Sequence, residues 1–258
     1  MATRKTIKLI KSLHQKKYRY QHRLFLVEGA KSVLELFATA TFTLKTLLGT
    51  KVFLQQHKNL FIQQLTDDQI FEVDEATLSG LGYFKNNNAA VAVVAFPTVS
   101  PVLPTADEYV LALDTISDPG NLGTILRVAD WYGINQIVCS PETTDVYAPK
   151  VISASMGSFL RVRVQYDSLS AYLEQAALPV YGAALNRGDN IHQLSPDRPG
   201  GIILLGNESV GINPNLNAFI SHYIHIPRYG RAESLNVGVA TAIVCDNLRR
   251  IGSREENK

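Results

Sequence analysis

The sequence lacks the features that mark several large classes of protein. Its 258 residues include only two cysteines, Cys139 and Cys245, and no C-x-x-C pair. Neither a disulfide framework nor a cysteine zinc site is therefore indicated. No apolar run reaches the roughly 18 residues that a membrane span needs, and the basic amino-terminal stretch has no apolar segment of the kind found in secretory signals. These absences favour a cytoplasmic globular protein whose two thiols are free and buried.

Motifs of several familiar catalytic sites are missing as well. There is no G-x-S-x-G, the turn that carries the nucleophile of many hydrolases. Gly206 and Gly211 have the spacing of a Walker sequence, but Ile212 follows where a lysine would be needed. The six histidines form no metal-spaced pair, so no metal is expected. A nucleotide-dependent oxidoreductase remains an alternative, although the dinucleotide fingerprint G-x-G-x-x-G is absent.

Positive charge is concentrated at one end of a nearly neutral chain. The net charge is +2, yet residues 1–23 carry eight lysines and arginines and no acid. Such a cationic patch suggests a polyanionic partner, although a solvated helix face would look the same. Tyr18, Tyr20 and Phe25 lie among or beside these charges. They could stack on nucleic-acid bases, or they could begin the core.

Alternating patterns predict a smaller α/β unit in the first part of the chain. Helical spacing of apolar residues runs through 5–17, and a second helix is predicted at 30–40. Strands are predicted at 25–29, 44–50 and 89–96. The proline-rich stretch that follows, within 97–107, reads as a linker. We therefore expect an amino-terminal domain at 1–98, a linker at 99–106 and a second domain at 107–258.

The second domain alternates strands with helices, which favours a mostly parallel sheet. Its predicted strands are 109–114, 136–140, 161–165, 180–185, 201–207 and 223–227. Its predicted helices are 122–132, 148–158, 168–177, 214–221 and 234–250.

Three strand ends of the second domain carry glycine-rich polar segments. They read SDPGNLGTILR (117–127), LLGNESVGI (204–212) and IPRYGRAESLNVGVATAI (226–243). In open parallel sheets, ligands bind beyond the carboxyl ends of the strands. Each polar residue also has a plain structural interpretation. Ser117, Asn121, Ser234 and Asn236 could be helix caps, Arg127 could form an ion pair, and Glu208 could pair with Arg127 or cap the next helix.

Taken together, the three segments resemble the motifs of the SpoU/TrmH family of RNA ribose 2′-O-methyltransferases, in the SPOUT superfamily. The first family motif matches Asn121 to Arg127, the second matches LLGNESVGI, and the third matches I-P, a glycine and S-L-N in the last segment. The match covers residues 106–258. The amino-terminal unit, with KKYRYQHRLFLVEGAKSVLEL, looks like the accessory RNA-binding domain of the family.

The resemblance implies an α/β fold with a deep carboxy-terminal trefoil knot, a feature that general fold rules would exclude. It implies S-adenosylmethionine as the cofactor and a homodimer as the working form. By the same resemblance, Leu185, Gly206, Ile226 and Leu235 would hold the cofactor, largely through backbone groups.

The resemblance also assigns the catalytic residues. Arg127 would engage the ribose 2′-hydroxyl, although arginine stays protonated and is a poor base, so an RNA phosphate would have to assist. Asn121 and Glu208 would position Arg127 and the RNA. Ser234 and Asn236 would help to bind RNA phosphate and would shape the methionine end of the cofactor pocket.

The implied function is methylation of a ribose 2′-hydroxyl in RNA, and the accessory domain favours ribosomal RNA over transfer RNA. A non-catalytic RNA-binding protein of the same fold is the alternative from another class.

Overall fold

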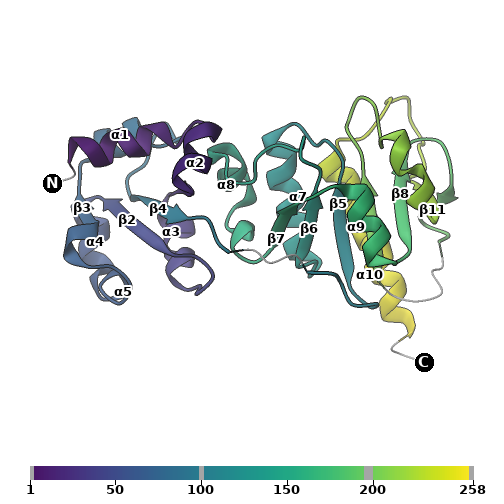
Figure 1. Ribbon diagram of the computed structural model, residues 1–258, viewed down its shortest axis with the longest axis horizontal. Helices are drawn as coiled ribbons and strands as arrows, with labels where there is room; N and C mark the ends of the chain where they lie inside the picture. Colours follow the sequence, from purple (N-terminus) through teal and green to yellow (C-terminus); the bar gives the residue numbers. More distant parts are fainter. Residues whose placement is uncertain (1–2, 99–101, 195–199, 256–258) are drawn as a thin grey trace. The chain divides into compact units, whose positions relative to one another are not determined.

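The computed structural model describes residues 3–98, 102–194 and 200–255 (Figure 1). The described residues form two compact units. The first holds the residues up to Thr98 together with Asp145–Leu160, and the second holds the rest. In the part of the chain that is described, no helix combines the length and the apolar character that crossing a membrane requires.

The first unit is built on a four-stranded sheet in the order β1-β4-β2-β3. β4 pairs with both β1 and β2 in antiparallel fashion, and β3 pairs with β2 in parallel. The elements of this unit are α1 (Arg4–Ser12), α2 (Lys16–His22), β1 (Leu24–Glu28), α3 (Ala30–Phe37), β2 (Leu44–Gly49), α4 (Lys51–Gln56), α5 (Lys58–Phe61), η1 (Asp67–Gln69), β3 (Ile70–Glu72), α6 (Glu75–Leu81), β4 (Ala90–Ala95), α8 (Pro149–Ser155) and η2 (Ser158–Leu160).

The basic amino-terminal segment forms two helices rather than the single helix expected at 5–17. Ile10 and Leu13 are buried and join a core with residues of β1, β2, α6 and β4. α1 therefore covers one face of the sheet with its apolar side and leaves its lysines exposed. Phe25, expected either to stack on bases or to begin the core, is fully buried.

One boundary differs from the expected domain division. The segment Asp145–Leu160, expected within the second domain, packs with the first unit. The centroid of its Tyr147 ring lies 4.7 Å from the centroid of the Phe25 ring, and the centroid of its Phe159 ring lies 6.1 Å from the same point. This aromatic cluster has no local signature, because its members are far apart in the sequence.

A buried ion pair also holds this segment. The Arg19 guanidinium donates through Nε and Nη2 to Oδ2 of Asp145, at 2.9 and 2.6 Å, and each side chain is only 4% exposed. Its Nη1 donates to the carbonyl oxygens of Leu13 and His14. Arg19, counted from the sequence among the cationic patch, is therefore a structural residue that carries its charge inside the unit.

The second unit contains a seven-stranded sheet in the order β7-β6-β5-β10-β8-β11-β9, and every adjacent pair is parallel, as predicted. The elements are β5 (Tyr109–Leu113), α7 (Pro119–Trp131), β6 (Gln136–Cys139), β7 (Arg163–Tyr166), α9 (Leu169–Ala176), β8 (Val180–Ala184), β9 (Asp189–Asn190), β10 (Gly201–Leu205), η3 (Pro214–Phe219), β11 (His222–His225) and α10 (Val237–Glu255). The segment expected as a helix at 214–221 is the 3₁₀ helix η3.

The central strands are buried on both faces, which explains their unbroken apolar sequences. Val110 and Ile202 belong to a core that α9 and η3 cover. Alternate residues of a strand point to opposite faces, so Leu111 and Ile203 face the other side, where α7 and α10 pack together (Figure 1). Cys139 and Cys245 are both buried, and burial raises the pKa of the Cys245 thiol to about 12.

We expect the Asp145→Ala variant to lose about 3–5 kcal/mol of unfolding free energy, because it leaves the Arg19 charge buried without its carboxylate. The matched control is Asp130→Ala, which removes a more exposed ion pair in which Oδ2 of Asp130 lies 2.8 Å from Nη2 of Arg161. This variant should lose less than about 1 kcal/mol of unfolding free energy. Urea unfolding followed by circular dichroism measures both. Equal losses would show that burial does not decide the strength of the Arg19–Asp145 pair.

Candidate functional site

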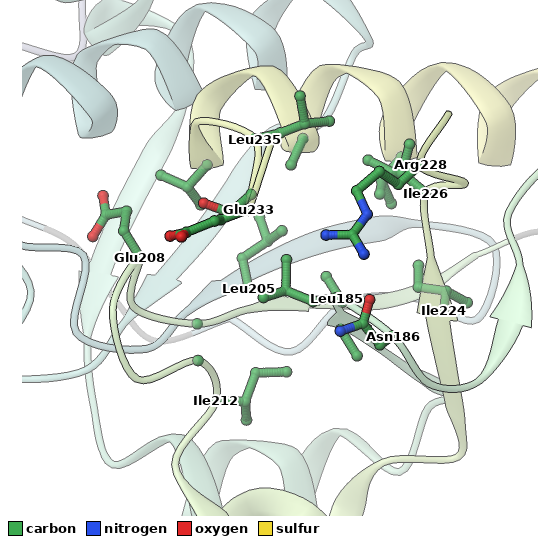
Figure 2. A pocket seen from close by; sticks show the side chains of 18 of the residues that line it. Leu185, Asn186, Leu205, Glu208, Ile212, Ile224, Ile226, Arg228, Glu233 and Leu235 are labelled. Atoms are coloured by element: carbon green, nitrogen blue, oxygen red, sulfur yellow. The ribbon is translucent and has the colours of Figure 1, made fainter. Parts of the chain in front are cut away.

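A pocket of about 550 Å³ opens at the carboxyl ends of the neighbouring strands β8, β10 and β11 (Figure 2). Three segments that follow these strands supply most of its walls. This is the edge at which ligands bind in open parallel sheets. The pocket is lined by Ala183–Arg187, Leu205–Ile212, Ile224, Ile226–Gly230, Ala232–Leu235, Val237, Ala240 and Val244.

The walls are mainly apolar, with charged groups at separate places. All four residues expected to hold a cofactor, Leu185, Gly206, Ile226 and Leu235, line the pocket. Arg228 points toward the side of Asn186, whereas Glu233 lies toward Glu208 (Figure 2). The pocket thus offers an apolar slot with carboxylates toward one side and a guanidinium toward the other.

The loop after β10 is folded back on itself at the pocket floor. Asn207 and Gly211 exchange two backbone hydrogen bonds of 3.0 and 2.9 Å. A Cβ on Gly206 would overlap the backbone of Gly211 and Ile212, so only glycine fits there. The Asn207 amide also donates to the carbonyl of Thr115, at 2.9 Å, and this bond ties the loop to the end of β5.

The carboxylate of Asp114, which was not among the predicted site residues, fixes the same region. Asp114, directly after β5, is buried and accepts through Oδ2 from the backbone N–H of Asn213, at 2.7 Å. The signal was present in the sequence, because a carboxylate that directly follows a buried strand needs a partner. Asp114 and Asn207 together set the course of the backbone from 205 to 213.

Hydrogen bonds through Asn121 join all three glycine-rich segments. Its Nδ2 donates to Oε1 of Glu208 at 2.6 Å, and its Oδ1 accepts from Nδ2 of Asn236 at 2.8 Å. Three of the five predicted catalytic residues are thus bonded in a row. Glu208, expected to pair with Arg127 or to cap a helix, instead binds Asn121.

Of the residues considered as helix caps, Asn236 has that role at α10, whereas α7 is capped by a residue that was not considered. Asp118 caps α7 by accepting from the backbone N–H of Asn121, so neither Ser117 nor the Asn121 side chain has that role. At α10, Oδ1 of Asn236 accepts from the N–H groups of Gly238 and Val239, at 2.9 and 3.3 Å. Asn236 is therefore the cap, and Ser234 is instead a lining residue of the pocket.

Arg127 lies on an exposed side of α7. Asn121, Thr124 and Arg127 recur every third residue and so follow one another along one side of the helix. Thr124 packs so closely on Gly238 at the start of α10 that a Cβ there would lie 2.8 Å from its methyl group. Among the described residues, the Arg127 side chain has no hydrogen-bond or ion-pair partner, and Arg127 is not one of the residues that line the pocket. Its guanidinium is therefore available to a ligand outside the pocket.

Two family models match the chain. The model of the SpoU rRNA Methylase family matches residues 108–246, and the model of the MRM3-like substrate binding domain matches residues 4–92. The 23S rRNA (guanosine(2553)-2′-O)-methyltransferase RlmP of Bacillus subtilis is 31% identical over 252 residues, covering 96% of this chain and 97% of that protein.

Solved structures resemble the chain over nearly its whole length. An AdoMet-bound rRNA methyltransferase from Sinorhizobium meliloti has a TM-score of 0.86 and 29% identity, covering 97% of this chain and 96% of that one. A protein of the TrmH family from Porphyromonas gingivalis has a TM-score of 0.83 and 34% identity, covering 97% and 99%. These matches include both compact units.

The two roles of Asn236 can be separated. We expect Asn236→Ala to lose about 1 kcal/mol of unfolding free energy, because it removes the cap of α10. Asn236→Asp keeps a capping oxygen but cannot donate to Asn121, so its stability should stay within about 0.5 kcal/mol of the wild type. Urea unfolding compares the two variants. A loss as large in Asn236→Asp as in Asn236→Ala would assign the stability to the Asn121 bond instead of the cap.

Proposed function

The chain belongs to the SpoU rRNA methylase family, and from this membership we propose that it transfers a methyl group from S-adenosylmethionine to a ribose 2′-hydroxyl of ribosomal RNA. The observation that carries the proposal is the Asn121 bridge, which joins Glu208 and Asn236 beside a pocket at the carboxyl ends of three strands. The AdoMet-bound relative and the ribosomal RNA named for the Bacillus relative support the cofactor and the substrate.

The pocket suits the cofactor by the chemistry of its walls. Leu185, Ile226 and Leu235 offer an apolar slot for a flat adenine, and exposed backbone groups of the loops can meet its polar edge. The close fold of the loop at Gly206 brings such backbone groups to the pocket. When bound, S-adenosylmethionine supplies a methyl group that is already activated by a sulfonium charge.

The charged residues at the pocket complement the rest of such a ligand. Glu208 and Glu233 place carboxylates on one side, where they favour a cationic centre. Arg228 places a guanidinium toward the other side, where it can bind a carboxylate. A molecule that carries both charges, as the cofactor does, is thereby oriented in one direction.

Arg127 acts on the RNA in this proposal. Its guanidinium stays protonated and donates hydrogen bonds, so it orients the ribose oxygen or a neighbouring phosphate instead of removing the proton itself. The proton of the 2′-hydroxyl leaves to an RNA phosphate oxygen that Arg127 holds nearby. Ser234 and Asn236 contact the RNA backbone, and Asn121 and Glu208 keep α7 in place. Positioning of the hydroxyl in line with the methyl group accounts for much of the acceleration.

The proposal extends to partners and setting. Ribosomal RNA is favoured over transfer RNA by the match of the first unit to a substrate-binding domain. A homodimer in the cytoplasm is the proposed working form. Trp131 of α7 is 83% exposed and Val239 of α10 is 48% exposed, and a second copy would cover such side chains. The trefoil knot implied by the resemblance stays a prediction.

The central test is transfer of radiolabelled methyl from S-adenosylmethionine to total RNA of a strain that lacks the protein. The wild type should produce a 2′-O-methyl nucleoside in ribosomal RNA. Arg127→Ala should lower the rate by roughly a hundredfold or more, because a preorganised hydrogen-bond donor is lost. The dissociation constant for S-adenosylmethionine, measured by calorimetry, should stay within about twofold because Arg127 lies outside the pocket lining.

The other outcomes each have a meaning. Loss of cofactor binding along with transfer would show that Arg127 is structural. Label found only in the transfer-RNA fraction would show that the substrate is transfer RNA and not ribosomal RNA. No label in any RNA, with no binding of S-adenosylmethionine by the wild type, would favour a non-catalytic RNA-binding protein.

The pocket can be tested without the reaction. Gly206→Ala should weaken binding of S-adenosylmethionine by roughly tenfold or more, since an added methyl forces the loop to move. Gly230→Ala is the matched control, because Gly230 also lines the pocket and a Cβ there meets no atom within 4 Å. Its dissociation constant should stay within about twofold of the wild type. Equal effects of the two substitutions would place the cofactor away from the 206–212 loop.

A further inference from the structure

The first unit contains a loop that is fixed from within. We define the 83–88 loop as the residues from Tyr83 to Asn88, between α6 and β4. The carboxylate of Glu28, which ends β1 and is 8% exposed, accepts from the backbone N–H groups of Tyr83 and Phe84, at 2.6 and 3.1 Å. A Cβ on Gly82 would overlap this carboxylate. The start of the loop is therefore held by a buried charge-assisted contact.

The end of the loop is fixed in a similar way. Asn87 is 4% exposed, and its Nδ2 donates to the carbonyl of Ala90 at 2.9 Å. Its Oδ1 accepts from the N–H of Ala89, and its own N–H donates to Oγ of Ser79. With both ends anchored, the loop is ordered before any ligand arrives, which lowers the entropic cost of binding.

The outward positions of the loop carry a different chemistry. Tyr83 is 49% exposed, and Lys85, Asn86 and Asn88 are exposed as well. The 83–88 loop thus carries an exposed aromatic ring, an exposed cation and two exposed amides within a short stretch of sequence. Aromatic rings stack on unpaired bases, a lysine contacts phosphate, and amides can bond base edges.

The loop also borders the basic amino-terminal segment. The ring Nε2 of His14 lies 2.7 Å from the carbonyl oxygen of Leu81, two residues before Tyr83. Lys16 and Lys17, separated from His14 only by Gln15, are exposed at the start of α2. Exposed cations of the patch therefore continue onto the same part of the unit as the 83–88 loop.

We propose that the 83–88 loop, together with Lys16 and Lys17, binds unpaired nucleotides of the RNA substrate. Tyr83 stacks on a base, Lys85 contacts a phosphate, and the two lysines of α2 follow the backbone. The identity of the partner as RNA rests on the proposed function, whereas the surface rests on the contacts within the first unit.

The experiment measures binding of the full-length chain to purified bacterial large-subunit ribosomal RNA by filter retention at several KCl concentrations, without cofactor. Tyr83→Ala should weaken binding by about 5- to 150-fold with an unchanged salt slope, because stacking is lost. Lys85→Gln should weaken binding and reduce the slope of log K against log salt by about 0.7, because one phosphate contact is lost. Tyr83→Phe should bind like the wild type, because the ring is kept.

The matched control is Val52→Ala with Lys58→Gln, which changes an exposed apolar side chain and an exposed lysine elsewhere in the same unit. It should bind like the wild type. The tested side chains point outward, so circular dichroism should show all variants folded.

Wild-type-like binding by Tyr83→Ala and Lys85→Gln would overturn the proposal, as would equal weakening by the control. Variants that bind naked RNA normally but lose binding to whole large subunits would assign the surface to a protein partner and also overturn it. Normal RNA binding by the wild type with no methyl transfer would refute the proposed function alone. No retention of RNA by the wild type would refute the surface.

Discussion

The candidate site depends on one amide side chain. Asn121 donates to Glu208 and accepts from Asn236, and these two bonds connect α7, the loop after β10 and the turn that begins α10. A carboxylate accepts only and a protonated amine donates only, whereas an amide does both. Among side chains of this length, asparagine therefore fits between a carboxylate acceptor and an amide donor. The requirement is chemical, and it explains why segments far apart in the sequence end at one place.

The Asn121 bridge lies between the residues that line the pocket and Arg127, which lies outside it. The apolar and glycine residues of the second and third segments face the pocket, whereas Arg127 lies farther along α7 and outside it. The close packing of Thr124 on Gly238 holds the two helices near each other. A cofactor and a polymer can therefore approach the same bridge from separate directions. That division is what a transfer between a small donor and a large acceptor requires.

Much of the second unit could be predicted from sequence because its signals are local. Buried strands such as β5 and β10 are short apolar runs, and their alternation with helices indicates a parallel sheet. The partner of Glu208 could not be predicted, because spacing along the chain does not say which polar groups meet. The sequence could not decide which residue caps α10, since Ser234 and Asn236 are both good capping residues; the structure shows that it is Asn236. The packing of Asp145–Leu160 with the first unit depends on Arg19 and Phe25, more than a hundred residues away.

Both units use the same device to prepare a surface. Glu28 ends β1 and Asp114 follows β5. Both are buried carboxylates: Glu28 accepts two backbone N–H groups from a loop, and Asp114 accepts one. Such an acceptor fixes the course of the loop backbone and touches no outward side chain. In the 83–88 loop, the outward side chains of Tyr83 and Lys85 are therefore not needed to hold the loop backbone in place. Substitutions at those outward positions can alter recognition without unfolding the loop, whereas a change at either carboxylate alters both.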